Sequence, residues 1–155
     1  MSSYQFKCTA VRDHITIIDN LVEMLLSANG VTETKRFCFA VHELVINSVE
    51  AMQKTACMKG ADQIVIRLRI DEEVLEFTIN DWGGGLPAEV YARLHTEESG
   101  ELSMDESGRG ISMIRMFIDE FIYFKESDGS CTYQIIKRRM DDDKNAENQS
   151  GGRDQ

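Results

Sequence analysis

Three polar residues in the segment HELVINSVEA have the spacing of one helical face. Glu43, Asn47 and Glu50 stand at i, i+4 and i+7, beside a stripe of apolar neighbours. The neutral amide oxygen of an asparagine suits a hard cation such as Mg²⁺, and a nearby carboxylate can accept a proton. The pattern predicts a polar site over a pocket. The alternative interpretation is a solvated helix face.

A second motif, Asp81-Trp82-Gly83-Gly84-Gly85, comes directly after a predicted strand. Consecutive glycines let the backbone approach a ligand closely and adopt hinge dihedrals that other residues avoid. A carboxylate at the end of a strand accepts hydrogen bonds, for example from the exocyclic amine of adenine. The segment is therefore a candidate ligand-binding hinge, and the alternative is a flexible turn.

The third motif, Gly108-Arg109-Gly110, precedes an apolar helical segment. Glycines at a helix N-terminus expose backbone N–H groups to a phosphate, and an arginine adds positive charge. A plain loop-to-helix junction has the same appearance, so this motif alone is a weak signal. The order of the three motifs is more informative, because a helical E-x₃-N, a strand followed by D-x-G-x-G, and a G-x-G before a helix rarely coincide.

Hydrophobic periodicity indicates the elements that position these motifs. Helical spacing predicts helices over residues 13–28, from Thr32 or Thr34 to about Lys59, over 87–91 and over 111–120. Alternation predicts strands over residues 4–10, 64–70, 75–80, 121–126 and 131–138. This order predicts an α/β two-layer sandwich with the helices on one face of a mixed, mainly antiparallel sheet.

Two polar segments interrupt or follow this pattern. Residues 95–107 contain five acidic residues and no basic one, which predicts a mobile surface loop between the second and third motifs. Residues 141–155 contain five acidic and two basic residues, a net charge of −3, which predicts a disordered tail. Residues 1–140 are therefore expected to form one domain.

The composition excludes several classes of protein. The chain of 155 residues has 17 Lys+Arg and 27 Asp+Glu, and its net charge of −10 disfavours direct binding to nucleic acid or to an anionic membrane. It lacks both an apolar run of about 18 residues and a signal-peptide pattern, which predicts a soluble, cytoplasmic protein. Four scattered cysteines are expected to be free thiols: Cys8, Cys38, Cys57 and Cys131.

The three motifs resemble the N box, G1 box and G2 box of the GHKL ATPase superfamily, whose members share the Bergerat nucleotide-binding fold. The similarity covers roughly residues 5–138. Gyrases, Hsp90 chaperones, MutL proteins and histidine kinases carry further domains. The predicted domain therefore most resembles the stand-alone anti-sigma-factor serine kinases.

This resemblance implies a role for each matching residue. Glu43 is implied as the general base and Asn47 as the Mg²⁺ ligand. Asp81 is implied to bind the adenine amino group of ATP. The remaining implied nucleotide-binding residues are Gly83 and Gly85 at the adenine edge, Gly108, Arg109 and Gly110 at the triphosphate, and Thr132 with a hydroxyl near adenine.

The sequence departs from the family pattern at two places. Ala51 stands where the anti-sigma kinases usually have a histidine, and Glu50 matches an acidic residue of the topoisomerase and MutL groups. Ser112 stands where many relatives have glycine. Neither departure removes a reactive group, but both concern the exact contacts with phosphate.

The resemblance also implies an activity and its partners. It implies a homodimeric serine/threonine protein kinase that uses Mg·ATP to phosphorylate an anti-sigma-factor antagonist, and that sequesters a sigma factor in a partner-switching mechanism. Two alternatives stay open. One is a regulatory module that binds ATP without turnover, and the other is a kinase that acts on a scaffold protein and controls a phosphatase.

Overall fold

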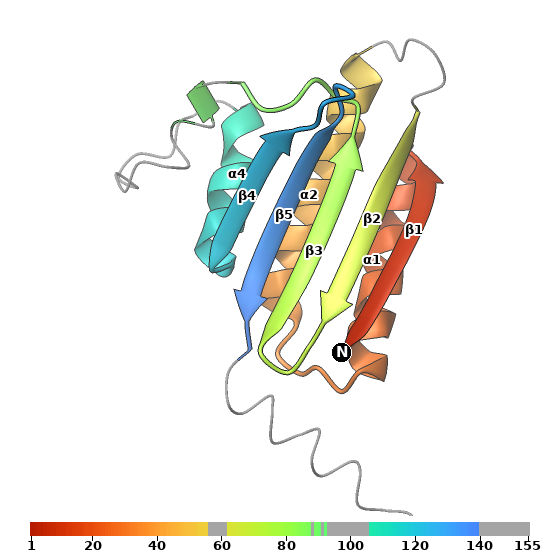
Figure 1. Ribbon diagram of the computed structural model, residues 1–155, viewed down its shortest axis with the longest axis vertical. Coiled ribbons are helices and arrows are strands. Elements are labelled where there is room, and N and C mark those ends of the chain that lie inside the picture. The colour runs from red at the N-terminus through yellow and green to blue at the C-terminus, as the bar shows by residue number, and fades with distance from the viewer. Residues whose placement is uncertain (56–61, 88, 91, 93–105, 140–155) are drawn as a thin grey trace, which may run out of the picture.

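The computed structural model describes residues 1–55, 62–87, 89–90, 92 and 106–139, with the backbone alone for residues 106–109 (Figure 1). Three of the sequence predictions fall outside these residues. They are the part of the acidic loop from residue 95 to 105, the tail at residues 141–155, and the thiol of Cys57.

Five strands form one sheet in the order β1-β2-β3-β5-β4 (Figure 1). Their bounds are β1 (Ser2–Thr9), β2 (Gln63–Ile70), β3 (Val74–Asp81), β4 (Glu120–Lys125) and β5 (Cys131–Arg138). All four neighbouring pairs are antiparallel. The central strand β3 ends at Asp81, which lies directly opposite Cys131 of β5. The second motif therefore begins at the end of the central strand.

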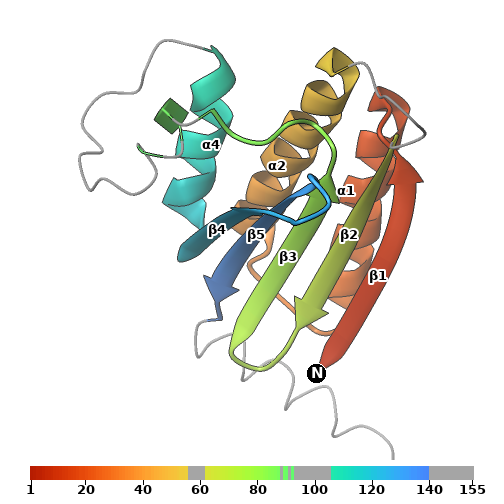
Figure 2. The same ribbon diagram turned by 45° about the horizontal axis from the view of Figure 1, so that its top comes forward.

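Three helices cover one face of this sheet, α1 (Arg12–Ala28), α2 (Lys35–Lys54) and α4 (Glu106–Phe117) (Figures 1 and 2). α2 lies in the middle of the helix layer and packs against both α1 and α4. A short helical turn near Glu89 follows Pro87, and the Val90 N–H donates to the Pro87 carbonyl at 3.0 Å. The predicted two-layer α/β sandwich is confirmed.

The core lies between the sheet and the helices, because strand alternation sends every second side chain to the helix side. On the two central strands β2 and β3 the buried positions alternate regularly. The buried row of β3 is Leu75, Phe77, Ile79 and Asp81. A carboxylate thus occupies the last position of a row that is otherwise apolar.

Two helix boundaries differ from the sequence prediction. α2 ends at Lys54 instead of about Lys59, because the Thr55 hydroxyl donates to the Ala51 carbonyl at 2.5 Å and the Thr55 backbone is extended. α4 begins at Glu106 instead of residue 111, so that Gly108 and Gly110 lie inside the helix. Each glycine costs a helix about 1 kcal/mol relative to alanine. Packing of α4 against α2 offsets this cost.

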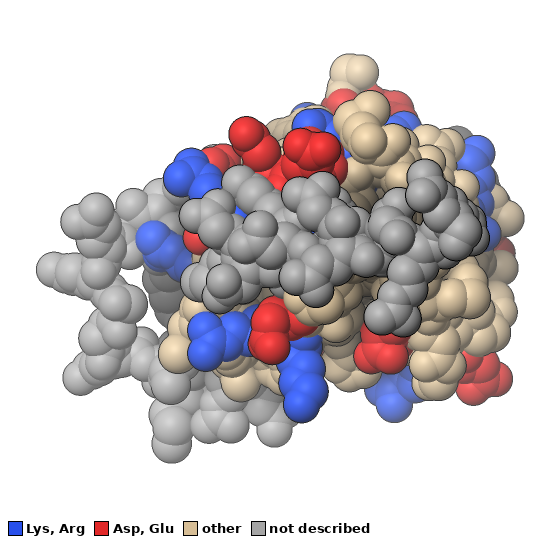
Figure 3. Space-filling view, turned by 90° about the horizontal axis from the view of Figure 1, so that it is seen from below, with Lys and Arg blue, Asp and Glu red and all other residues tan. Residues whose placement is uncertain are grey.

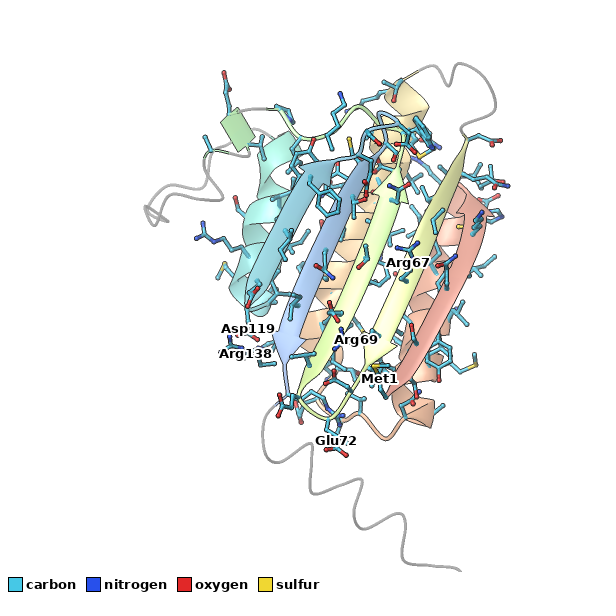
Figure 4. The ribbon with its side chains drawn as sticks, viewed as in Figure 1. Met1, Arg67, Arg69, Glu72, Asp119 and Arg138 are labelled. Carbon is cyan, nitrogen blue, oxygen red and sulfur yellow. The ribbon has the colours of Figure 1, made fainter. Side chains whose placement is uncertain are left out.

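The opposite face of the sheet is polar, and none of the three helices described above covers it. Arg67 and Arg69 of β2 lie on this face (Figure 4). Arg69 forms ion pairs with Asp71 at 2.8 Å and with Glu76 at 2.5 Å.

Seen from below, acidic and basic residues are interspersed on the described surface (Figure 3). No helix among the described residues is long and apolar enough to cross a membrane.

Candidate functional site

A cavity of about 760 Å³ lies between α2, Ile111 of α4, β5 and the glycine segment that follows β3, residues 83–86. This volume is in the range of pockets that bind small molecules. Residues from α2, β5 and the glycine segment line it, and they include Asn47, Ser48, Ala51, Gly83, Gly85 and Tyr133, together with the charged Glu50 and Lys54. The tertiary structure thus brings the first two sequence motifs together.

Asp81 lies beside this cavity and is completely buried. Its Oδ1 accepts a hydrogen bond from the Gly83 N–H at 3.0 Å, whereas its Oδ2 has no hydrogen-bond partner among the described residues. Burial raises the pKa of Asp81, and the nearby Ser48 hydroxyl and the Gly83 N–H partly oppose the rise. An unpaired buried carboxylate oxygen is unfavourable. Asp81 therefore offers an acceptor that a ligand with an N–H group can satisfy.

Asp81→Asn should stabilise the ligand-free protein at neutral pH, because it removes a buried charge that has one unpaired oxygen. The folded-state pKa of Asp81 is raised above its ordinary value of 3.8. The neutral carboxyl of Asp81 therefore stabilises the folded protein fully below that value. This stabilisation is lost as the pH rises through the raised pKa. We expect a gain of about 1 kcal/mol at neutral pH, or about 2–4 °C in Tm.

Thermal unfolding of both proteins across a pH series checks this expectation. The advantage of the Asp81→Asn variant over wild type should shrink as the pH falls, because the wild-type carboxyl becomes neutral. A variant that unfolds at a lower temperature than wild type at neutral pH would contradict the account of Asp81.

The glycine segment after Asp81 packs closely against α2. A Cβ atom on Gly83 would lie 2.6 Å from the Cβ of Ala51, so a larger residue at either position would force the two segments apart. Gly85 has a φ of +85°, a conformation that favours glycine. The small residue Ala51, a departure from the family pattern, thus matches the close approach of Gly83.

Glu43 and Asn47 lie at the other end of the site, against α4. A Cβ atom on Gly110 would lie 2.9 Å from Oε2 of Glu43 and 3.1 Å from Nδ2 of Asn47. That Nδ2 is buried and has no hydrogen-bond partner among the described residues. The structure therefore brings Glu43, Asn47 and Gly110 together, as expected if the first and third motifs serve one site. Asn47 lines the cavity, and α4 packs over Glu43.

Gly108 and Arg109 lie in the first turn of α4, and not in a loop before the helix as the sequence predicted. In an α-helix the first four N–H groups have no partner within the helix. For a helix that begins at Glu106 these groups lie in its first turn and exclude Gly110. The backbone N–H groups available to an anion are therefore those before Gly110.

Thr132 is a predicted site residue that lies on the other face of the sheet from the cavity. Its Oγ1 accepts a hydrogen bond from Asn80 Nδ2 at 3.0 Å and donates to Glu126 Oε1 at 3.0 Å. Thr132 pairs with Asn80 on the polar face of the sheet, opposite the helices. Because side chains alternate along β5, its neighbours Cys131 and Tyr133 point to the helix side instead. The structure therefore does not support the predicted contact between the Thr132 hydroxyl and adenine.

Sequence reasoning missed several residues of the cavity lining, including Tyr133 and Ser48. Tyr133 lines the cavity from β5 and is only 6% exposed. Ser48 lines it from α2, between the motif residue Asn47 and the core residue Val49. The signal for Tyr133 was the strand alternation itself, since it is the second residue after Cys131, which opposes Asp81.

These residues fit a nucleotide that carries a divalent cation. The unpaired Oδ2 of Asp81 suits an exocyclic amine. At Asn47 the amide nitrogen Nδ2 is unpaired, and rotation of the amide would place its oxygen there to face a cation. No group of three or more His, Cys, Asp or Glu side chains in the described part of the chain is arranged to hold a metal. Mg²⁺ is commonly bound by one or two protein ligands together with substrate phosphates, which is compatible with a single amide.

Residues 8–136 match the family model described as the histidine kinase-like ATPase domain. The match covers most of the chain, so the chain belongs to this family. The predicted resemblance to the GHKL ATPases is thereby confirmed, and membership implies that the domain binds ATP. No curated protein sequence matches the chain.

Solved structures that share the fold include the following two. The structure of the RsbU and RsbW domains of Rv1364c from Mycobacterium tuberculosis matches with a TM-score of 0.62 and 13% identity, over 90% of this chain and 34% of that one. The SiaB-SiaC complex from Pseudomonas aeruginosa matches with a TM-score of 0.61 and 10% identity, over 88% of this chain and 89% of that one. This chain thus spans about a third of the Rv1364c chain. At these identities the likeness shows the fold alone.

Proposed function

We propose that this chain is a protein serine/threonine kinase that transfers the γ-phosphate of Mg·ATP to a partner protein of the anti-sigma-factor antagonist type. The observation that carries the proposal is the pair of unpartnered polar groups at the cavity, Oδ2 of Asp81 and Nδ2 of Asn47. Buried polar groups are costly unless they are paired. In an ATPase domain the ligand that pairs them is ATP.

The chemistry would be shared among the residues of the three motifs. Asp81 would accept the adenine amine, and the first turn of α4 with Gly108 and Arg109 would hold the triphosphate. Glu43 would take the proton of the incoming serine or threonine hydroxyl. The hydroxyl oxygen forms a bond to the γ-phosphorus, the bond to the β–γ bridging oxygen breaks, and ADP leaves. Such transfer depends mainly on positioning and on charge neutralisation.

Asn47 is the residue that would hold the metal ion. When bound, Mg²⁺ neutralises charge on the phosphates of ATP. The amide of Asn47 supplies a neutral oxygen, which leaves the acidic side chain of Glu43 free for the proton transfer. Its place one helical turn after Glu43 puts these two functions on the same face of α2.

The partners are inferred from the resemblance together with the structural neighbours. One neighbour is an RsbW domain that shares a chain with an RsbU domain, and the other, SiaB, is bound to a second protein, SiaC. These two neighbours support a domain that acts together with partner proteins. We propose an antagonist protein as the phosphorylated partner, a sigma factor as the sequestered one, and a homodimer as the working form.

One observation favours a second candidate, an ATP-binding regulator without turnover. α4 packs over Glu43, and a Cβ on Gly110 would lie only 2.9 Å from its Oε2. In this arrangement the carboxylate is not among the residues that line the cavity. A kinase must move α4 at Gly110 to admit a substrate hydroxyl, whereas a regulator need not.

Transfer of labelled phosphate distinguishes the two candidates. The protein is incubated with Mg²⁺, ATP labelled in its γ-phosphate, and each protein encoded beside it, and mass spectrometry locates any phosphate. The kinase proposal expects label on a serine or threonine of one partner. The alternative result is that the protein binds ATP and forms a nucleotide-dependent complex with one of these proteins, but transfers no phosphate to it. In that case the regulator is the correct candidate.

A further inference from the structure

The strand β4 forms one edge of the sheet (Figure 1). Its residue Tyr123 packs against the core and therefore faces the helix side of the sheet. It pairs directly with Tyr133 of β5, which lines the cavity, and the two ring centroids are 5.1 Å apart with planes tilted by 38°. Its half-buried ring therefore packs behind the cavity wall. No sequence motif includes this residue.

The hydroxyl of Tyr123 meets the glycine segment at Gly85. A Cβ atom on Gly85 would overlap the Tyr123 hydroxyl oxygen and would lie 3.0 Å from Sγ of Cys131. The same hydroxyl donates to Cys131 Sγ at 3.8 Å. Burial and the Cys131 thiol raise the pKa of the Tyr123 phenol, and the backbone N–H of Leu86 lowers it. The phenol is thus neutral and in contact with the segment at Gly85 and Leu86.

The glycine segment needs such a contact because its own backbone is permissive. Gly84 and Gly85 both have positive φ, and glycine leaves neighbouring conformations accessible at little cost. The segment is held at its start by the Gly83 N–H, which donates to Asp81 at 3.0 Å. Tyr123 contacts its other end. The bond at Asp81 and the contact at Tyr123 thus flank the two flexible glycines.

We propose that Tyr123 is a positioning residue for the base of the bound nucleotide. It holds Gly85 and Leu86 in place, so that the wall of the cavity beside Asp81 keeps its shape. This inference rests on the proposed nucleotide site and adds a residue that the three motifs do not contain. Tyr123 acts through the glycine segment, whereas the proposed site would hold the phosphates at the Asn47 end of the cavity.

Tyr123→Phe tests the role, because it removes the hydroxyl and keeps the ring packed on Tyr133. Loss of one hydrogen-bonding group is expected to raise the Kd for ADP by about three- to tenfold. The Kd for inorganic tripolyphosphate with Mg²⁺ should stay within about twofold, since that ligand has no base. Calorimetry with both ligands separates positioning of the base from a general loss of structure.

Tyr4→Phe is the matched control. The Tyr4 hydroxyl accepts a hydrogen bond from Asn29 Nδ2 at 2.9 Å on the opposite edge of the sheet, so its loss is chemically similar but remote from the cavity. This variant should bind ADP like wild type. The inference is overturned if Tyr123→Phe binds ADP as tightly as wild type, if both ligands weaken equally, or if Tyr4→Phe weakens ADP as much.

These outcomes differ from a failure of the proposed function. If wild-type protein binds neither ADP nor ATP, the nucleotide site itself is wrong and the role of Tyr123 falls with it. If wild type binds ADP and only the Tyr123 comparison fails, the site stands and another contact holds the glycine segment.

Discussion

Glu43→Gln should lower the rate of phosphoryl transfer by about 10²–10⁴-fold, the usual effect of losing a general base. Glutamine has the size of glutamate and can form hydrogen bonds, but it accepts no proton at neutral pH. Its side chain also fits the same space beside Gly110, where Glu43 Oε2 is in close contact with α4. ATP affinity should therefore stay within about twofold of wild type.

Single-turnover transfer measures the rate of phosphoryl transfer, and calorimetry with ADP measures the nucleotide affinity. Glu72→Gln is the matched control, because Glu72 carries the same charge but is exposed in the turn between β2 and β3, at the end of β3 opposite to Asp81. That variant should transfer phosphate at close to the wild-type rate. A Glu43→Gln variant that phosphorylates the partner as fast as wild type would show that Glu43 is not the base.

Asn47→Ala should remove the part of nucleotide affinity that depends on Mg²⁺. Changes in residues that merely support a metal ligand already cost about 10–100-fold in affinity, so loss of the ligand itself should cost at least as much. No group of three His, Cys, Asp or Glu side chains in the described ranges stands ready to replace the amide. In the presence of a chelator the variant and wild type should bind ADP with similar affinity.

Asp81→Asn gives the complementary pattern and serves as the comparison. It should weaken ADP with or without Mg²⁺, because Oδ2 of Asp81 lies at the end of the site proposed for the base. Titration of both variants with ADP, with and without metal, assigns each residue to one end of the cavity. Equal losses for Asn47→Ala with and without Mg²⁺ would contradict its role as the metal ligand.

The sequence by itself determined the secondary structure and the order of the motifs. Periodicity is a local property, so the helical stripe of α2 and the alternation of β2 and β3 could be recognised from the residues alone. Glu43 and Asn47 share a face because a helix repeats every 3.6 residues. The class of fold and the family followed from this local information together with the resemblance.

Helix boundaries depended on tertiary contacts as well. Gly108 and Gly110 indicate a helix start by propensity, yet α4 begins at Glu106 because its packing on α2 outweighs the cost of two glycines. The end of α2 at Lys54 depends on the hydroxyl of Thr55, whose local bond to Ala51 competes with continuation of the helix.

Only the tertiary structure decided which face of the sheet each strand residue joins. Thr132 and Tyr133 are adjacent in sequence, but the register that pairs Asp81 with Cys131 sends Thr132 to the polar face and Tyr133 to the cavity. Because the side-chain period is two, a shift of one residue exchanges the faces, and register is set by contacts between distant strands. The contact between Tyr123 and Gly85 has the same origin, since it joins residues that meet only when β4 completes the sheet.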